Sequence, residues 1–199
     1  MRATVLAFVL ALAGACGQAQ ATTFVFNAVL NGLNEAPPNA SPGTGFANVT
    51  FDDEAHTMLV QLGFADLLGP NIAAHIHAAT DVAGTGTAPV ATVTPTFTGF
   101  PSGTTAGSYS HLFDMTAASS YRAGYLAGFG GSTAAAEAFL LQSAQDGKAY
   151  LNIHSTVFTG GEIRGFLSPA PEPQSWALMI VGFGLAGAGL RTQRRLERA

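Results

Sequence analysis

This sequence is poor in cysteine and in charged residues. The chain of 199 residues contains one cysteine, Cys16, near its N-terminus. The rest of the chain therefore has no disulfide, no cysteine nucleophile and no thiolate ligand. Charged residues make up only 10% of the chain, while apolar residues reach 48%. This composition excludes a disordered chain and favours short strands and turns over an all-helical fold.

Basic residues are rarest in the middle of the chain. Between residues 22 and 170 there are three, Arg122, Lys148 and Arg164, against ten acidic residues, a net charge of −7. Nucleic-acid binding needs a basic surface, so we predict no nucleic-acid partner. Gly-x-Ser-x-Gly elbows and glycine-rich phosphate loops are missing too. Glu35 and Glu162 are a candidate carboxylate pair of unknown separation, and we predict a protein that is not an enzyme.

The N-terminal segment has the features of a secretory signal. Met1-Arg2 precedes an apolar run from Ala3 to Ala15, and Ala19-Gln20-Ala21 supplies small residues where signal peptidase cleaves. The run is too short to span a bilayer comfortably. We therefore predict a signal peptide over residues 1–21. The alternative is a lipoprotein attached through Cys16, which lacks the usual preceding leucine.

The C-terminal segment, residues 169–199, has three parts in a fixed order. Pro171-Glu172-Pro173 lies in an extended spacer. Residues 176–190 are apolar and uncharged, and an arginine cluster follows at Arg191, Arg194 and Arg195. A helix of 15 residues is about 22 Å long, so it would span a core of about 30 Å by thinning the bilayer. Because arginines stay on the cytoplasmic side, we predict a transmembrane helix with the preceding domain outside.

This order of parts resembles the PEP-CTERM sorting tail. The resemblance implies a Gram-negative bacterium and recognition by an exosortase-type sorting enzyme, with cleavage near Pro171-Glu172-Pro173. It also implies a link to exopolysaccharide or biofilm matrix. The alternative is a permanent single-pass anchor. We expect the protein to be held transiently in the inner membrane and then to reach the cell surface or the exterior.

Residues 22–168 remain for one domain. Apolar residues alternate with a period of two at 24–30, 47–51 and 58–64, and turn-forming residues separate these runs. Further strands are expected at 73–78, 89–93, 109–115, 149–155 and 162–167. This pattern predicts a mainly β fold, a single antiparallel β-sandwich or barrel-like domain. Helices are expected at 133–145, after an N-cap at Ser132-Thr133, and at 121–129.

Histidine and charged side chains are so rare in this domain that their placement is informative. His75 and His77 flank Ile76, and on a strand their side chains lie on one face, about 7 Å apart. Two later predicted strands repeat this arrangement around an isoleucine: Asn152 with His154, and Glu162 with Arg164. If the three strands share a sheet, one of its faces carries all six polar side chains.

Three interpretations of this polar face stay open. His75, His77 and His154 are a sound ligand set for zinc or copper, and Glu162 paired with Arg164 would orient the imidazoles. The face could instead be a solvated surface, or a hydrogen-bonded network that fixes the strand ends without a metal. His56 and His111 have no comparable neighbours and are expected at the surface.

Three segments of the domain resemble the CHRD family in order and spacing. They are LNGLNEAPP at 30–38, AAHIHA at 73–78, and GKAYLNIHST at 147–156 followed by GGEIRG at 160–165. Ser155 stands where the family often has threonine. The resemblance implies a compact extracellular β-domain and no established activity. The characteristic positions that it implies are Glu35, His75, His77, Asn152, His154, Glu162 and Arg164.

The sequence leaves two functions open. One is an exported, non-enzymatic surface or matrix module that binds a partner protein or polysaccharide, as chordin, which gave the family its name, binds growth factors. The other is an exported copper- or zinc-binding protein that uses the three-histidine site, with redox activity left open. The His-Ile-His strand is similar to the copper strand of Cu/Zn superoxide dismutases, but the further ligands of that enzyme are not recognisable here. Signal peptidase and an exosortase are the partners expected during export.

Overall fold

The computed structural model describes residues 23–171 together with 180, 181 and 183. The predicted signal peptide and its cleavage site lie outside the described residues, as do Glu172, Pro173 and the arginine cluster. No described helix combines the length and the apolar character that crossing a bilayer requires.

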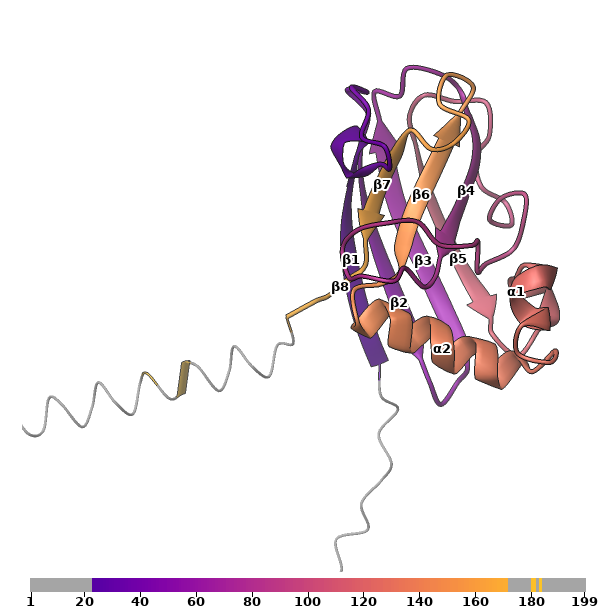
Figure 1. Ribbon diagram of the computed structural model, residues 1–199. Helices are drawn as coiled ribbons and strands as arrows, with labels where there is room; N and C mark the ends of the chain where they lie inside the picture. The colour runs from indigo at the N-terminus through magenta and orange to yellow at the C-terminus, as the bar shows by residue number, and fades with distance from the viewer. Residues whose placement is uncertain (1–22, 172–179, 182, 184–199) are drawn as a thin grey trace, which may run out of the picture.

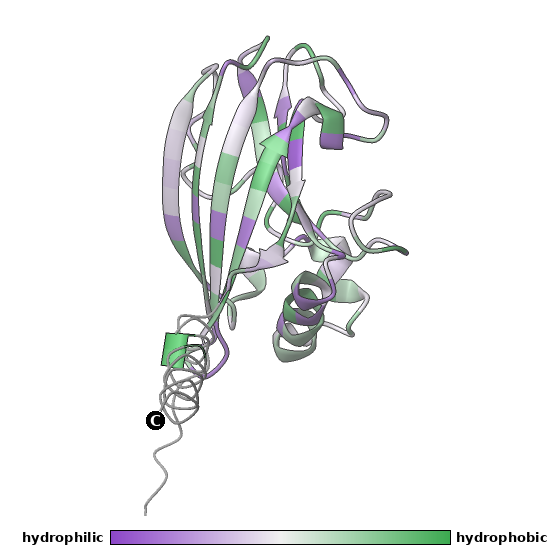
Figure 2. Cartoon of the chain, turned by 90° about the vertical axis from the view of Figure 1, so that its left-hand side faces the viewer, coloured by the Kyte–Doolittle hydropathy of each residue, from purple (hydrophilic) through white to green (hydrophobic). Residues whose placement is uncertain are grey.

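One antiparallel sheet, curled into a half-barrel, forms the domain (Figures 1 and 2). Its strand order is β4-β6-β7-β1-β2-β3-β5, and a two-residue strand, β8, pairs with β1. The bounds are β1 Thr23–Asn31, β2 Thr44–Asp52, β3 Thr57–Ala65, β4 Asn71–His77, β5 Gly107–Asp114, β6 Tyr150–Ser155, β7 Ile163–Phe166 and β8 Ser168–Pro169. The prediction of a mainly β, antiparallel, barrel-like domain is confirmed.

Two α-helices accompany the sheet, and α2 crosses one end of it in Figure 1. α2, Thr133–Gln145, has the predicted bounds, because the Ser132 side chain accepts a hydrogen bond from the Ala135 N–H and caps its first turn. α1, Ala123–Ala127, covers only the middle of the predicted 121–129 helix. The domain also contains two short 3-10 turns, η1 at Gly32–Asn34 and η2 at Ala118–Ser120.

The prediction of a strand at residues 89–93 is wrong. This segment follows the free edge of β4, where Val90 makes an isolated bridge with His77, while Thr92 makes its bridge with Tyr121. The Ile76 N–H donates to the side-chain oxygen of Thr92 rather than to a backbone carbonyl. A regular ladder therefore does not form, and the segment covers the edge as a loop.

The inner face of the sheet carries the hydrophobic core. Alternate residues of the strands point inward, as in β2, where Ala47, Val49 and Phe51 are fully buried. Phe97, from the loop before β5, adds a ring that stacks on Tyr109 at a centroid distance of 5.7 Å. Slipping a strand by one residue would expose this core, so burial fixes the register. The register in turn decides which side chains reach the outer face.

The outer face has two unlike halves. We call the part on β4, β6 and β7 the covered half, because the loops 78–88 and 156–161 hydrogen-bond to its side chains. We call the part on β1, β2, β3 and β5 the open half. There, Val29, Phe46 and Leu112 are 65%, 52% and 59% exposed.

Candidate metal centre

The polar residues of the covered half come from neighbouring strands. β4 and β6 pair in antiparallel register, with His75 opposite Asn152. Ile76 and Ile153, which alternate with the polar residues, face the core and are fully buried. The predicted polar face therefore forms on β4 and β6, and the core residues on its reverse side hold it in place.

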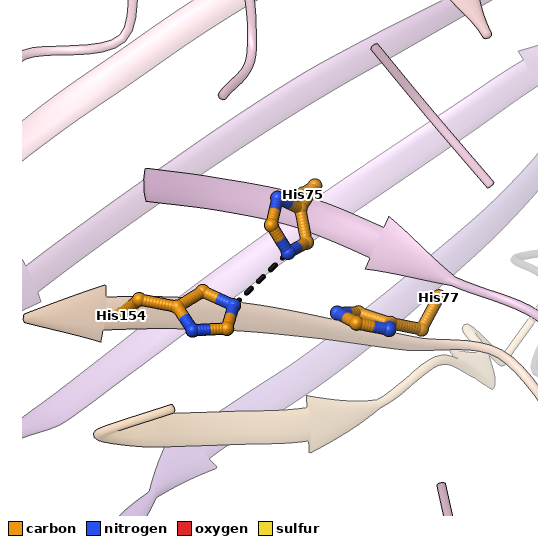
Figure 3. A group of neighbouring side chains, drawn as sticks. All are labelled: His75, His77 and His154. Carbon is orange, nitrogen blue, oxygen red and sulfur yellow. Dashed lines mark hydrogen bonds between the residues drawn. The ribbon is translucent and has the colours of Figure 1, made fainter. Parts of the chain in front are cut away.

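The three histidines converge on one point (Figure 3). Their ligand nitrogens all lie within 4.8 Å of one another, and Nε2 of His75 is 2.9 Å from Nε2 of His154. An ion bound about 2.0–2.1 Å from each nitrogen would need nitrogens about 3.3–3.6 Å apart. The observed spacings lie on both sides of that range. Side-chain shifts of about 1 Å would therefore complete a trigonal or tetrahedral site.

Backbone carbonyls fix the protonation of two of the rings. Nδ1 of His77 lies 2.7 Å from the Ala88 carbonyl oxygen, and Nδ1 of His154 lies 2.9 Å from that of Thr159. A carbonyl only accepts, so each neutral ring carries its proton on Nδ1 and keeps a lone pair on Nε2. Metal-bound histidines are oriented in the same way.

His75 completes the cluster with a different hydrogen-bond pattern. Because Nε2 of His154 carries no proton, His75 Nε2–H donates the bond between them in the metal-free protein. His75 Nδ1 is then buried without a hydrogen-bond partner, and so is Nε2 of His77. To bind a metal through Nε2, His75 would carry its proton on Nδ1 instead. Buried polar atoms are nearly always paired in proteins. Two unpaired ring nitrogens in one cluster therefore mark it as unusual.

Burial keeps the rings neutral. It is the largest cause lowering the pKa of His75 to about 3, and the adjacent His77 and His154 act in the same direction. Burial likewise lowers the pKa of His77 to about 4 and lowers that of His154. Neutral imidazole is the form that binds metal ions, so near neutral pH protons do not compete for these nitrogens.

A stack of side chains joins the cluster to Arg164. The Tyr150 ring lies parallel to the His77 ring at 4.6 Å, and the Arg164 guanidinium lies 4.7 Å from the Tyr150 centroid. Tyr150 Oη accepts from the Ala88 N–H at 3.3 Å, and Arg164 Nη1 donates to the Gly86 carbonyl at 2.9 Å. Both side chains thus hold the loop whose Ala88 carbonyl orients His77. Sequence reasoning missed Tyr150, although it precedes Asn152 by two residues and so shares its face.

Glu35 is the buried acid of this region. It is 7% exposed, accepts from Asn152 Nδ2 at 2.7 Å, and lies 3.8 Å from Arg164 Nε. Arg164 Nε also donates to the Asn34 carbonyl. Burial raises the pKa of Glu35 to about 7, although the charge of Arg164 acts to lower it. Glu35 therefore joins Asn152, through a hydrogen bond, and Arg164, through an ion pair, into one polar group.

Glu162 lies apart from this group, which corrects the expected pairing of Glu162 with Arg164. Its Oε1 accepts from Ser41 Oγ and from the Leu68 N–H, both at 2.6 Å. Glu162 precedes β7, so its fully buried side chain ties two loops together, while Arg164 pairs with Glu35. The two candidate carboxylates, Glu35 and Glu162, are thus held by different partners.

The remaining two histidines lie outside the cluster. His56 is half-exposed, and its Nδ1 lies 2.9 Å from Oε2 of Glu137. His111, on β5, is only partly exposed and packs against Tyr109 and Phe113. Neither contributes to the group of converging ligand nitrogens found among the described residues. Both are therefore available as controls.

Comparison with protein families agrees with the motifs in the sequence. The CHRD domain matches residues 26–167, and the PEP-CTERM protein-sorting motif matches residues 169–195. No curated protein and no solved structure is detectably similar to the chain. The sorting motif implies export with a membrane-anchoring tail and processing by an exosortase. The chain belongs to the CHRD domain family and is an exported, exosortase-sorted member of it.

Proposed function

We propose that the exported domain binds one copper or zinc ion through His75, His77 and His154. The observation that carries this proposal is the convergence of three neutral imidazoles, two of which have Nδ1 held by a backbone carbonyl. Copper and zinc ions are both coordinated by imidazole nitrogen atoms in proteins. Tyr150 and Arg164 would hold the Gly86–Ala88 backbone that orients His77.

The unpaired His77 nitrogen favours a ligand site over a purely structural network. A network without metal would leave His77 Nε2 unsatisfied, at a cost of about 1–3 kcal/mol. A bound ion would use the His77 lone pair. A solvated surface fits less well still, because His75 is only 6% exposed.

Metal titration tests the proposal directly. The exported full-length protein, purified in detergent and stripped with a chelator, should bind one equivalent of copper or zinc by calorimetry and elemental analysis. His77→Ala and His154→Ala should lose this binding. His56→Asn is the matched control, because asparagine tolerates the positive φ of 52° at that position. Less than about a tenth of an equivalent bound by the wild type would contradict the proposal.

A second candidate function, binding of a partner or a neutral polysaccharide, is favoured by the open half. A row of amide and hydroxyl side chains crosses four strands in register, formed by Asn27, Asn48, Gln61 and Ser110. Beside it, Val29 lies opposite the exposed Phe46. These rows carry no charge in an acidic domain. Affinity electrophoresis in the host exopolysaccharide should retard the wild type but not Phe46→Ala; equal mobility with and without the polymer would contradict this candidate.

A further inference from the structure

The donor set of the histidine cluster carries no negative charge. Among the described residues, the group of converging ligand atoms contains three histidines and neither a carboxylate nor a thiolate. Asn152, which lies opposite His75, offers at most a neutral amide oxygen. An ion held here would keep its full positive charge.

Arg164 is the cation beside the cluster. Its guanidinium lies 4.7 Å from the centroid of Tyr150, whose ring stacks on His77, and Glu35, 3.8 Å from Arg164 Nε, offsets part of its charge. The remaining repulsion between a bound ion and this guanidinium is proportional to the charge of the ion. A divalent ion is therefore repelled twice as strongly as a monovalent one, and burying its charge without an anion costs more.

The number of donors points in the same direction. Zinc in proteins takes four ligands, and three protein ligands leave the fourth to water. Here His75 is buried and the His77 Nε2 atom has no solvent contact. A monovalent copper ion is satisfied by a trigonal set of nitrogens and needs no water. Resting on the proposed function, we infer that the cluster selects Cu(I) over divalent zinc or copper.

Competition titrations separate this inference from the proposed function. The full-length exported protein is titrated anaerobically with Cu(I), supplied as its acetonitrile complex, against bicinchoninate, and with Zn(II) against a zinc chelator. We expect Cu(I) to bind at least about tenfold more tightly than Zn(II), and His154→Ala to lose Cu(I). X-ray absorption should show three nitrogen neighbours and no fourth ligand. Cluster-dependent zinc binding of equal or greater strength would overturn the inference alone. Failure of both ions to bind would overturn the proposed function with it.

Discussion

The two halves of the outer face show that, on this sheet, hydrophobicity alone does not decide what is buried. On the covered half, Asn152 and Arg164 are 2% and 3% exposed, whereas Phe46 on the open half is 52% exposed. Both halves share one sheet and one core. The difference comes from the loops, which hydrogen-bond to the side chains of β4, β6 and β7.

Burying polar groups requires partners for them, and the exceptions are informative. Most polar atoms of the covered half are paired, but His75 Nδ1, His77 Nε2 and Asn152 Oδ1 are buried without a partner. Such departures from full pairing are expected where a protein binds something. The covered half thus combines a paired scaffold with an incompletely paired cluster, and the predictions below separate the two.

Replacing Arg164 should give the largest difference in stability loss between substitutions on the two halves. Above pH 7, where Glu35 is ionised, Arg164→Met nearly keeps the volume but leaves Glu35 buried without its cation, so the unfolding free energy should fall by about 3–5 kcal/mol. Gln61→Ala, on the open half, should cost less than about 0.5 kcal/mol. Urea denaturation measures both. Equal costs would show that the covered half has no special dependence on its ion pair.

Replacing Gly161 should destabilise the protein nearly as much as replacing Arg164. A Cβ there would lie 2.5 Å from Asn152 Nδ2 and 2.8 Å from Glu35 Oε1, and its φ is 135°. Gly103 also has a positive φ, 79°, but faces open space. Gly103→Ala should cost about 1–2 kcal/mol through its backbone alone. Gly161→Ala should cost about 1–3 kcal/mol more through crowding, and a thermal melt that ranks the two equally would argue against a tightly packed network.

Acid should destabilise the metal-free protein. The pKa values of the three clustered histidines lie below their ordinary 6.5, so the unfolded chain binds protons that the folded chain excludes. Stability should therefore fall as the pH drops below 6.5. Glu35, whose pKa is raised from 4.5 to about 7, acts in the opposite direction between those values.

Glu35→Gln tests this balance. It removes the opposing contribution, so the loss of stability between pH 6.5 and 4.5 should become steeper than in the wild type. Urea unfolding across this range gives both slopes. Stability that does not change with pH in either protein would mean that the histidines are not held neutral by burial.

Tyr150→Phe should have the smallest effect on stability. It removes the contact of Tyr150 Oη with the Ala88 N–H, worth about 0.5–1.5 kcal/mol, and should weaken metal binding a few-fold by loosening the partner of His77. Tyr109→Phe is the matched control, because it loses a hydrogen bond to the Thr98 carbonyl in the core. Calorimetry should find its metal affinity unchanged. Equal affinities in the two variants would remove Tyr150 from the site.

Local patterns predicted the strands and the shared polar face because side chains alternate strictly along a strand. The same rule could have identified Tyr150. The partners of Arg164 could not be predicted, because Asn34 ends the 3-10 turn η1 and Gly86 lies in a loop, and the positions of both depend on contacts distant in sequence. The strand expected at 89–93 failed for a similar reason, since a Thr92 side chain takes the place of a backbone partner.

The central claim is that His75, His77 and His154 are ligands and not only a structural network. Melting of the wild type and of His77→Ala, each with and without copper and zinc, tests it most directly. At an ion concentration 100-fold above the dissociation constant, the wild type should gain about 2.7 kcal/mol, with a higher Tm, and His77→Ala should gain nothing. A Tm that is indifferent to both metals in both proteins would contradict the claim and leave a structural network in its place.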